Sequence, residues 1–434
     1  MTPAGADRDA DDARGGAAMT PEQAEHYLLS LELFGMHFGL ERMRRLMTAL
    51  DRPEQRFASI HVVGTNGKSS TVRMVAAILA HHGLRTGAYL SPHLVSFGER
   101  IRIDDRDLPP ERFAAAVQRA ARAAALVDRS GTGEDPVTQF EALTAAAYSE
   151  LAEQGVEVAV IEAGLGGRYD ATNVIPSRVQ VLTSVGLEHT RWLGPTLTDI
   201  ATEKLDVVQP HATLVLGAGL APEVRAVADR VAAEREATIV EASTEPGLPV
   251  GAPGAYQRRN FALAMAAAEA FLGRLDADAV VAAAASVRVP GRLQQVGTDP
   301  LTLLDGAHNP DGARALVESL GELAAGHDRV IAVVSILDDK DAATMLRTLN
   351  PAVDGYVLTS CANPRALPPP TLSSLVSQLG GPGGGENAIV PDPHRALAHA
   401  RELAGPDGLV VATGSLYLIA DLLAPAGRRR ASSL

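Results

Sequence analysis

The sequence has few of the residues that would place it outside a reducing compartment or on nucleic acid. Among 434 residues there is one cysteine, Cys361, so no disulfide can form within the chain. A reducing cytoplasm is therefore the location that we expect. Positive charge is also scarce, because 39 Lys and Arg stand against 52 Asp and Glu, a net charge of −13. Non-specific nucleic-acid binding needs a basic surface, so nucleic acid is not an expected partner.

Long hydrophobic runs and aromatic residues are lacking as well. No run reaches the roughly 18 apolar residues of a membrane-spanning helix, and we expect no membrane partner. Residues 1–18 are acidic, rich in Ala and Gly and without the apolar segment of a signal peptide, so they read as a disordered leader, with Met19 as an alternative start. Aromatic residues make up only 4% of the chain. Small aliphatic side chains must build the cores, which suits helices packed on parallel sheets.

Short β-branched runs alternate with Ala-rich helical stretches, the pattern of a doubly wound α/β fold. The length predicts two to three domains. We expect the leader at 1–18, a larger domain at 19–288 and a smaller one at 289–434, with a loop at 379–386. The larger domain should contain strands at 59–63, 86–90, 156–162, 179–185, 214–217 and 238–241, and helices at 68–82, 111–127, 140–153, 262–273 and 278–287. The smaller domain should contain strands at 301–304, 330–334, 355–358 and 409–412.

A glycine-containing turn follows the first strand and precedes a helix at Lys68. A strand, such a turn and a helix beginning with Lys-Ser form a cradle for phosphate, because backbone N–H groups and the helix N-terminus face the anion. Lys68 would reach the terminal phosphates. The strict eight-residue phosphate-loop pattern fails, since Val62 stands where its first glycine belongs. An ordinary Gly-Asn turn that caps a helix is the alternative.

The turn reads GTNGK and resembles the ATP loop of the folylpolyglutamate synthase/dihydrofolate synthase branch of the Mur ligase superfamily. Ser69 replaces the glycine that usually follows the lysine. Further motifs of that family occur in the family's order between about residues 28 and 424. They are SPHL at 91–94, ERI at 99–101, EAGLGGRYDATN at 162–173, EHT at 188–190, PGR at 290–292, DGAHNP at 305–310 and GSLY at 414–417.

The resemblance implies a fold and an activity. The fold is a P-loop-containing Mur-ligase-type ATPase domain with a parallel-sheet core, at 19–288, plus a smaller Rossmann-like α/β domain. The activity is ATP-dependent addition of L-glutamate to dihydropteroate, to the glutamate tail of folates, or to both, through an acyl phosphate. ATP and Mg²⁺ are the implied cofactors, and a monomer is expected. A paralogous ligase for another carboxylate is the first alternative. A nucleotide-driven P-loop switch is the second.

The resemblance also implies the ATP and metal sites. Independently of it, Glu162 ends an apolar strand, and the carboxyl end of such a strand is where an open α/β site holds its ligands. Magnesium is expected at Ser91, Glu162 and His189, and Lys68, Glu162, His189 and Lys204 are the expected catalytic residues. The residues expected to bind ATP are Gly64, Thr65, Asn66, Gly67, Lys68, Ser69, Ser70, Asn260, Arg292, Asp305 and His308.

The resemblance bears on three further features. The family's counterpart of Lys204 is often carbamylated, although Leu205-Asp206-Val207 replaces its usual Ala-Gly-Ile, and a surface lysine is the alternative. Phe140 and Glu141 are expected to bind the acceptor's flat heterocycle, although Phe140 is equally well read as a core aromatic. Tyr169, Asp170 and Ala171 complete the expected acceptor site, with Tyr169 where the family often has leucine. An Asp-Lys cluster at 338–341 is read as a domain-closure contact or as a solvated charge cluster.

Overall fold

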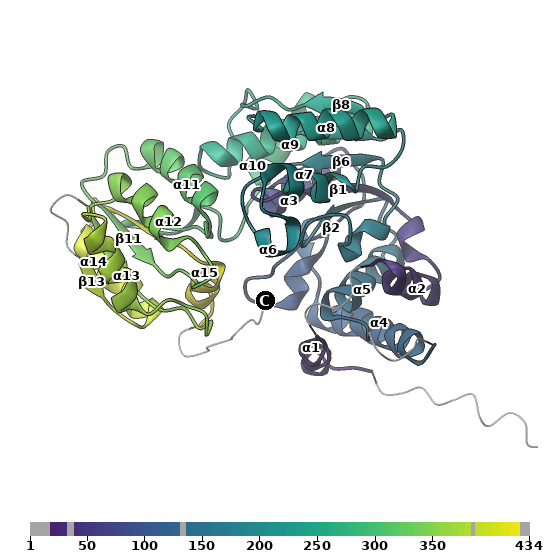
Figure 1. Cartoon of the computed structure of the whole chain (residues 1–434), viewed down its shortest axis with the longest axis horizontal. Coiled ribbons are helices and arrows are strands. Elements are labelled where there is room, and N and C mark those ends of the chain that lie inside the picture. Colours follow the sequence, from purple (N-terminus) through teal and green to yellow (C-terminus); the bar gives the residue numbers. More distant parts are fainter. Residues whose placement is uncertain (1–17, 33–38, 131–135, 383–386, 426–434) are drawn as a thin grey trace, which may run out of the picture.

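The computed structural model describes residues 18–32, 39–130, 136–382 and 387–425. The predicted leader lies outside the described residues except for Ala18, and part of the predicted loop at 379–386 lies outside them too. Figure 1 shows two lobes, each built on its own sheet. The predicted boundary between residues 288 and 289 falls between the last strand of the first sheet and the first strand of the second, and it stays a prediction.

The first lobe contains an eight-stranded sheet in the order β4-β3-β2-β5-β1-β6-β7-β8. The five strand pairings from β2 through β5, β1, β6 and β7 to β8 are parallel. The β2–β3 and β3–β4 pairings at the other edge are antiparallel. The strands are β1 Ala58–Val63, β2 Thr86–Tyr89, β3 Ile101–Ile103, β4 Arg106–Asp107, β5 Val158–Glu162, β6 Val179–Leu182, β7 Thr213–Leu216 and β8 Thr238–Glu241.

Helices cover both faces of this sheet. The helices of the first lobe are α1 Pro21–Ser30, α2 Glu41–Ala49, α3 Lys68–His81, α4 Pro110–Ser130, α5 Gln139–Glu153, α6 Thr190–Leu193, α7 Leu197–Leu205, α8 Pro222–Arg235, α9 Ala255–Leu272 and α10 Ala277–Ser286. Short 3₁₀ helices are η1 Pro53–Gln55, η2 Phe97–Arg100 and η3 Ala171–Val174.

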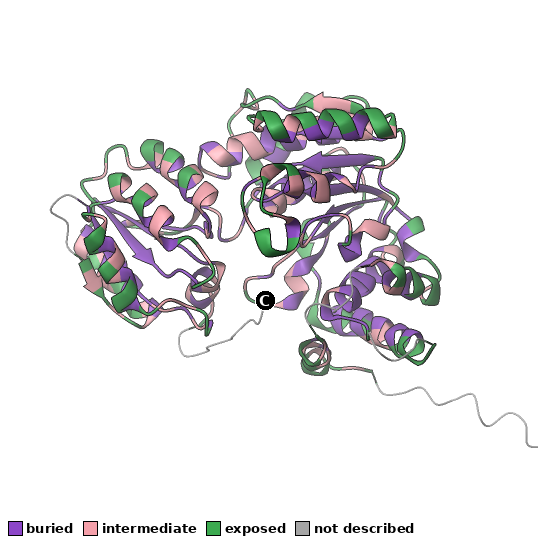
Figure 2. Ribbon diagram, in the orientation of Figure 1, coloured by how far each residue is buried: buried purple, intermediate pink, exposed green. Residues whose placement is uncertain are grey.

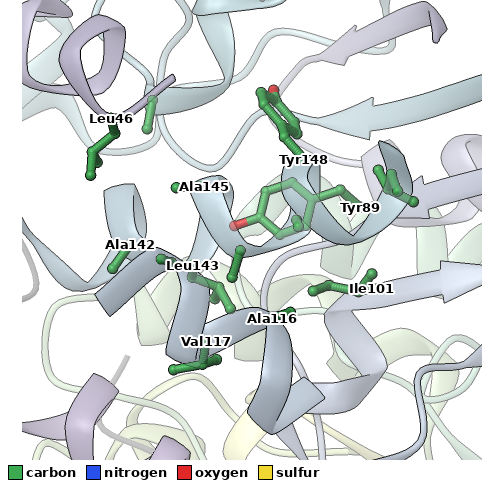
Figure 3. Close-up of a cluster of buried hydrophobic side chains, with 14 of the residues drawn as sticks. Leu46, Tyr89, Ile101, Ala116, Val117, Ala142, Leu143, Ala145 and Tyr148 are labelled. Atoms are coloured by element: carbon green, nitrogen blue, oxygen red, sulfur yellow. The ribbon is translucent and has the colours of Figure 1, made fainter. Parts of the chain in front are cut away.

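The period of two along β5 explains how one strand serves two cores. Val158 and Val160 pack with α3, α9 and α10 on one face, whereas Ala159 and Ile161 pack with α4 and α5 on the other. In the second of these cores Tyr89 and Tyr148 lie among Ala, Val and Leu side chains (Figure 3). Many of the few aromatic residues therefore lie in the core between the sheet and the helices α4 and α5.

The second lobe contains a six-stranded sheet in the order β13-β12-β11-β14-β10-β9, parallel except for the edge strand β9. Its strands are β9 Gln294–Thr298, β10 Leu301–Leu304, β11 Val330–Val334, β12 Gly355–Leu358, β13 Asn387–Ile389 and β14 Leu409–Thr413. Its helices are α11 Pro310–Leu323, α12 Ala342–Leu349, η4 Asn350–Ala352, α13 Pro369–Gln378, α14 Pro393–Ala404 and α15 Leu416–Leu423. Helices α11 to α13 cover one face and α14 and α15 the other.

The observed architecture confirms the predicted α/β class with largely parallel sheets. The central strands of both sheets are buried and the outer helix faces are exposed, as Figure 2 shows. Several details differ from the sequence-based expectation. The helix α9 begins at Ala255 rather than at 262, β5 begins at Val158 rather than at 156, and β6 ends at Leu182 rather than at 185. The strands β3, β4, β9 and β13 and the helices α1, α2 and α8 were not predicted. Among the described helices none is long and apolar enough to span a bilayer.

Candidate active site

A cavity of about 830 Å³ lies between the carboxyl ends of the strands in the first lobe and the loops of the second. Its volume lies in the range of small-molecule sites. Of the predicted site residues, Gly64 and Lys204 do not line it. Those that do are Thr65, Asn66, Gly67, Lys68, Ser69, Ser70, Ser91, Phe140, Glu141, Glu162, Tyr169, Asp170, Ala171, His189, Asn260, Arg292, Asp305 and His308.

The turn between β1 and α3 has a backbone that only glycine accommodates at two positions. Gly67 has a φ of +87°, and a Cβ there would lie 2.7 Å from Asn260 Oδ1. A Cβ on Gly64 would lie 1.9 Å from Thr183 Oγ1. The N–H of Thr65 donates to the carbonyl of Ser184 at 2.8 Å, which fixes the turn against the chain after β6. The turn is thus a tight backbone cradle at a helix N-terminus, and it fits a bound phosphate.

Two ammonium groups converge on one carbonyl of this cradle. Lys68 Nζ donates to the carbonyl oxygens of Gly64 and Thr65 at 3.1 and 3.2 Å, and Lys204 Nζ donates to Gly64 at 2.9 Å. Lys204 is buried at the end of α7, and burial together with the charge of Lys68 lowers its pKa to about 7. Lys204 therefore lies behind the cradle rather than on the surface, which rules out the surface-lysine alternative.

The predicted metal ligands lie beside the cradle. Glu162, the last residue of β5, is fully buried and accepts hydrogen bonds from Ser69 Oγ at 2.9 Å and from the N–H of Ser91 at 3.1 Å. Burial raises its pKa, and the charge of Lys68 opposes that shift. His189 has a left-handed φ of +53° where α6 begins, and burial lowers its pKa, which favours the neutral imidazole that can bind a metal.

These donors fit magnesium bound through few protein ligands. In the part of the chain that the structure describes, no three His, Cys, Asp or Glu side chains form a ready metal cluster. Mg²⁺ usually keeps several waters and binds through one or two carboxylates plus substrate phosphates. A single buried carboxylate next to the phosphate cradle, Glu162, meets that requirement, with the hydroxyls of Ser69 and Ser91 and the imidazole of His189 nearby.

The acceptor side of the cavity is organised by carboxylates that already have protein partners. Asp170 accepts hydrogen bonds from the N–H groups of Leu165 and Thr172 and from the Thr172 hydroxyl. Glu141 closes a capping box on Thr138 and accepts from Arg42 Nε at 3.1 Å. Both side chains therefore shape the pocket wall, and direct binding of the acceptor by either carboxylate stays a prediction.

Phe140 lies between the core and the cavity. Its ring centroid is 6.2 Å from that of Tyr89, and a Cβ added to Gly164 would lie 2.7 Å from Phe140 Cζ. The ring also lines the cavity. Phe140 thus packs on a core aromatic and also lines the pocket, and its contact with the acceptor stays a prediction.

The second lobe brings its predicted residues to the same cavity. Asp305 accepts hydrogen bonds from Tyr256 Oη at 2.5 Å and from the N–H groups of Leu293 and Ala307. Arg292 Nη1 donates to the carbonyl of Gly291 at 3.1 Å. Asp305 thereby ties α9 to the second lobe, and its contact with the nucleotide stays a prediction.

The charged residues that line the cavity but were not selected as site residues from the sequence include Glu188 and Lys340. Glu188 carries a carboxylate that meets Lys340 Nζ at 3.1 Å and His308 Nε2 at 3.3 Å across the lobes. Burial alone would raise the pKa of Glu188, but His308 and Lys340 hold it well below its usual range. The Asp-Lys cluster at 338–341 supplied a signal for Lys340, read as a closure contact or a solvated cluster. For Glu188 the signal was its position before His189.

A family model matches the second lobe, and known proteins are similar to this chain over most of its length. Residues 291–416 match the model of the Mur ligase, glutamate ligase domain. The chain is 36% identical over 383 residues to the dihydrofolate synthase/folylpolyglutamate synthase of Mycobacterium tuberculosis, covering 79% of this chain and 78% of that protein. It is 35% identical over 429 residues to the probable bifunctional folylpolyglutamate synthase/dihydropteroate synthase of Haloferax volcanii. That match covers 93% of this chain but spans only 50% of the archaeal protein.

Solved structures agree with the observed fold. Mycobacterium tuberculosis folylpolyglutamate synthase complexed with ADP and AMPPCP has a TM-score of 0.84 and 32% identity, over 92% of this chain and 97% of that one. E. coli FolC in complex with DHPP and ADP has a TM-score of 0.81 and 29% identity, over 94% and 97%. The bifunctional enzyme of Yersinia pestis complexed with AMPPNP and Mn has a TM-score of 0.81 and 30% identity, over 93% and 97%.

Proposed function

The chain belongs to the folylpolyglutamate synthase/dihydrofolate synthase family, and we propose that it adds L-glutamate to dihydropteroate, to the glutamate tail of folates, or to both, with cleavage of ATP to ADP and phosphate. The observation that carries the proposal is one cavity joining a phosphate cradle, a buried carboxylate with hydroxyl and imidazole neighbours, and an aromatic-edged pocket. We also propose that it acts as a monomer in the cytoplasm, on ATP, L-glutamate and a folate-type acceptor.

The chain's residues assist two bond exchanges. In the first, a carboxylate oxygen of the acceptor attacks the γ-phosphorus of ATP, the bond to the β-phosphate oxygen breaks and an acyl phosphate forms. In the second, the amine of L-glutamate attacks the acyl carbon, phosphate leaves and the amine loses a proton. No protein nucleophile is required, so positioning and charge stabilisation account for the catalysis.

Lys68 and the glycines of the cradle hold the phosphates in this scheme. Lys68 turns from the carbonyls of Gly64 and Thr65 to the terminal phosphate, where its charge offsets the negative charge of the transferred group. Magnesium, held by Glu162, Ser91 and His189, neutralises phosphate charge when bound. The second lobe supplies Arg292 and His308 from the opposite wall and shields the acyl phosphate from water.

Lys204 is proposed to carry a carbamate. A neutral lysine amine adds to CO₂ and loses a proton, so the modification needs an amine whose pKa is low. Burial and the charge of Lys68 lower the pKa of Lys204 to about 7, which supports the proposal. The product would be an anionic group directly behind Gly64 and near Lys68. Its negative charge would fix Lys68 and offset the cost of burying two cations side by side.

The decisive experiment measures phosphate release by the purified protein with Mg-ATP and L-glutamate, with dihydropteroate or tetrahydrofolate added separately. The products are identified by mass. A gain of one glutamate on dihydropteroate indicates dihydrofolate synthase activity, and a gain on both acceptors indicates a bifunctional enzyme. Nucleotide turnover without either product would move the proposal to a ligase for another carboxylate.

A further inference from the structure

Three residues of the second lobe contact one carboxylate of the first lobe, that of Glu188, which lines the cavity. Glu188 lies after β6 and accepts from Asn309 Nδ2 at 3.2 Å and from Lys340 Nζ at 3.1 Å, and it meets His308 Nε2 at 3.3 Å. All three of these partners belong to the second lobe. The side chains of Glu188 and Lys340 are only 11% and 14% exposed, so these contacts are largely shielded from water.

The orientation of His308 strengthens this contact. Its Nδ1 lies 2.8 Å from the carbonyl oxygen of Gly306, and its Nε2 faces the Glu188 carboxylate. Each ring nitrogen thus faces one oxygen, so the ring is fixed in orientation between Gly306 and Glu188. Glu188 is therefore held by the ammonium group of Lys340, the carboxamide of Asn309 and the imidazole of His308. A carboxylate with several charge-assisted partners is among the strongest polar contacts in proteins.

The same contact continues into the phosphate cradle. Asn309 and Asn66 exchange hydrogen bonds between their carboxamides at 3.1 and 3.2 Å. Asn309 also begins α11, where its Oδ1 accepts from the N–H of Gly312 at 2.7 Å. Asn309 thereby connects the N-terminus of α11 to two places in the first lobe. One is Asn66, the middle residue of the GTNGK turn, and the other is Glu188, the residue before His189.

Two ion pairs between the lobes are of a different kind. Arg258 pairs with Glu322 and Arg259 with Glu318, both between α9 and α11, and the Glu322 side chain is 55% exposed. Ion pairs this open to solvent contribute little to holding two bodies together. The Glu188 contacts are buried and lie beside the cradle, so they, together with the Tyr256–Asp305 hydrogen bond, can couple lobe position to the geometry of the site.

We propose that Glu188 is a positioning residue that holds the second lobe closed on the phosphate cradle through Lys340, His308 and Asn309. Closure and alignment of Asn66 and His189 then occur together, because Asn309 contacts both Asn66 and Glu188, and Glu188 directly precedes His189. The proposal rests on the proposed function only for its kinetic readout. The lobe position can be measured without turnover.

Two spin labels report the lobe position, one on each lobe. Leu126→Cys on α4 and Glu402→Cys on α14 are suitable sites, since both are exposed and the native Cys361 is buried. With Mg-ATP, the unsubstituted site should give a narrow distance distribution. Glu188→Gln should broaden it or shift it to longer distances, whereas Glu322→Gln, the matched control on the outer pair, should leave it unchanged. An unchanged distribution in Glu188→Gln overturns the proposal.

A double-mutant cycle tests the pair by kinetics. Glu188→Gln and Lys340→Met should each lower kcat/KM by roughly tenfold, and the double variant should lose little more than either single one, since both remove the same contact. Additive losses with unaltered label distances would show that the residues act separately, which overturns the proposal. If the wild-type protein ligates no folate acceptor, the proposed function fails, while the label distances still decide the role of Glu188.

Discussion

Lys204 Nζ lies 2.9 Å from the carbonyl oxygen of Gly64, so the last turn of α7 supports the phosphate cradle from behind. Lys68 Nζ reaches the same oxygen at 3.1 Å. Two ammonium groups on one carbonyl are stable only if one of them readily loses its proton or gains a negative partner, and the buried Lys204 is the one whose pKa is lowered. This relationship makes the chemistry of Lys204 testable.

Activity should depend on dissolved CO₂ through Lys204. With its pKa near 7, about half of the Lys204 amine is neutral at pH 7, against about one in three thousand for an ordinary lysine, so carbamate formation should increase from pH 6 to 8. CO₂-free buffer should lower turnover roughly tenfold, and bicarbonate should restore it. The ¹³C signal of a carbamate formed from labelled bicarbonate reports occupancy directly.

Lys204→Arg is the matched control for this prediction, since it keeps a cationic donor for Gly64 but cannot be carbamylated. It should be inactive and insensitive to bicarbonate. A free amine at high bicarbonate together with full activity of Lys204→Ala would contradict the assignment.

Glu162→Gln should separate metal binding from folding. The amide keeps a partner for Ser69 but loses the charge, so turnover should fall by about a hundredfold or more. The melting temperature of the free protein should not decrease, because burial already raises the pKa of this carboxyl and the neutral side chain avoids that cost. Thermal shifts with and without Mg-ATP measure this, and the stabilisation by Mg-ATP should disappear. Near-normal turnover would remove Glu162 from the site.

Lys68→Ala should abolish turnover in a folded protein. The substitution removes the cation expected at the terminal phosphate but leaves the glycine cradle in place. Circular dichroism should be unchanged and phosphate release should be lost. A variant that still turns over at a normal rate would show that the cradle works without its lysine.

Gly164→Ala should weaken acceptor binding and spare ATP binding. The added methyl group would lie 2.7 Å from Phe140 Cζ and must displace the ring that lines the pocket. We expect KM for the acceptor to increase roughly tenfold with KM for ATP unchanged. Gly321→Ala in α11, where a Cβ meets nothing within 4 Å, is the control and should behave as wild type. Equal effects on both substrates would indicate a general loss of structure instead.

His61 should make the fold sensitive to acid. This β1 residue is fully buried, and burial lowers its pKa to about 4, while the unfolded chain has an ordinary histidine near 6.5. Both states are neutral above pH 6.5. Between pH 6.5 and 4 the unfolded state binds the proton and the folded state does not, so stability is lost as the pH falls.

Urea unfolding at pH 7 and pH 5 measures this effect. Relative to His61→Gln, the wild type should lose about 2 kcal/mol more between the two pH values. Gln is a suitable reference because it can still bond Thr172 Oγ1, the partner of His61 Nε2 at 2.9 Å, and does not titrate. An equal loss in both proteins would show that His61 is protonated in the folded state.

The strands that carry the site could be predicted because they are apolar runs closed by distinctive residues. Val158–Glu162 is buried on both faces, so its sequence shows no alternation of apolar and polar residues. Its length and its terminal carboxylate nevertheless mark it as a strand that ends at a site. Strands β3, β4, β9 and β13 lie at or next to a sheet edge and are short or largely exposed, so they lack the long apolar run that marks the central strands. The start of α9 was missed because its first turn is polar and packs on the second lobe rather than on its own sheet.

The side chains of the site were easier to find than their partners. Motif positions such as Lys68 and Glu162 indicate a role from residue type and place in the chain. The partner of Glu188 is Lys340, 152 residues away, and only the packing of the two lobes brings them together. Likewise, no sequence pattern shows that the Asp170 carboxylate accepts its hydrogen bonds from Leu165 and Thr172. Phe261, the neighbour of Asn260, has a packing role, because this side chain is fully buried between α9 and α3.

The helix α9 contacts both the second lobe and the phosphate cradle within about one turn. Tyr256 bonds the second lobe at Asp305, and Asn260 lies against the glycine that begins α3. Four residues of helix separate these points, a rod of about 6 Å. We therefore expect a movement of the second lobe at Asp305 to reach the phosphate cradle through α9, and a nucleotide bound in the cradle to restrict that movement. Occupancy of the phosphate cradle by nucleotide and the position of the second lobe should therefore depend on each other.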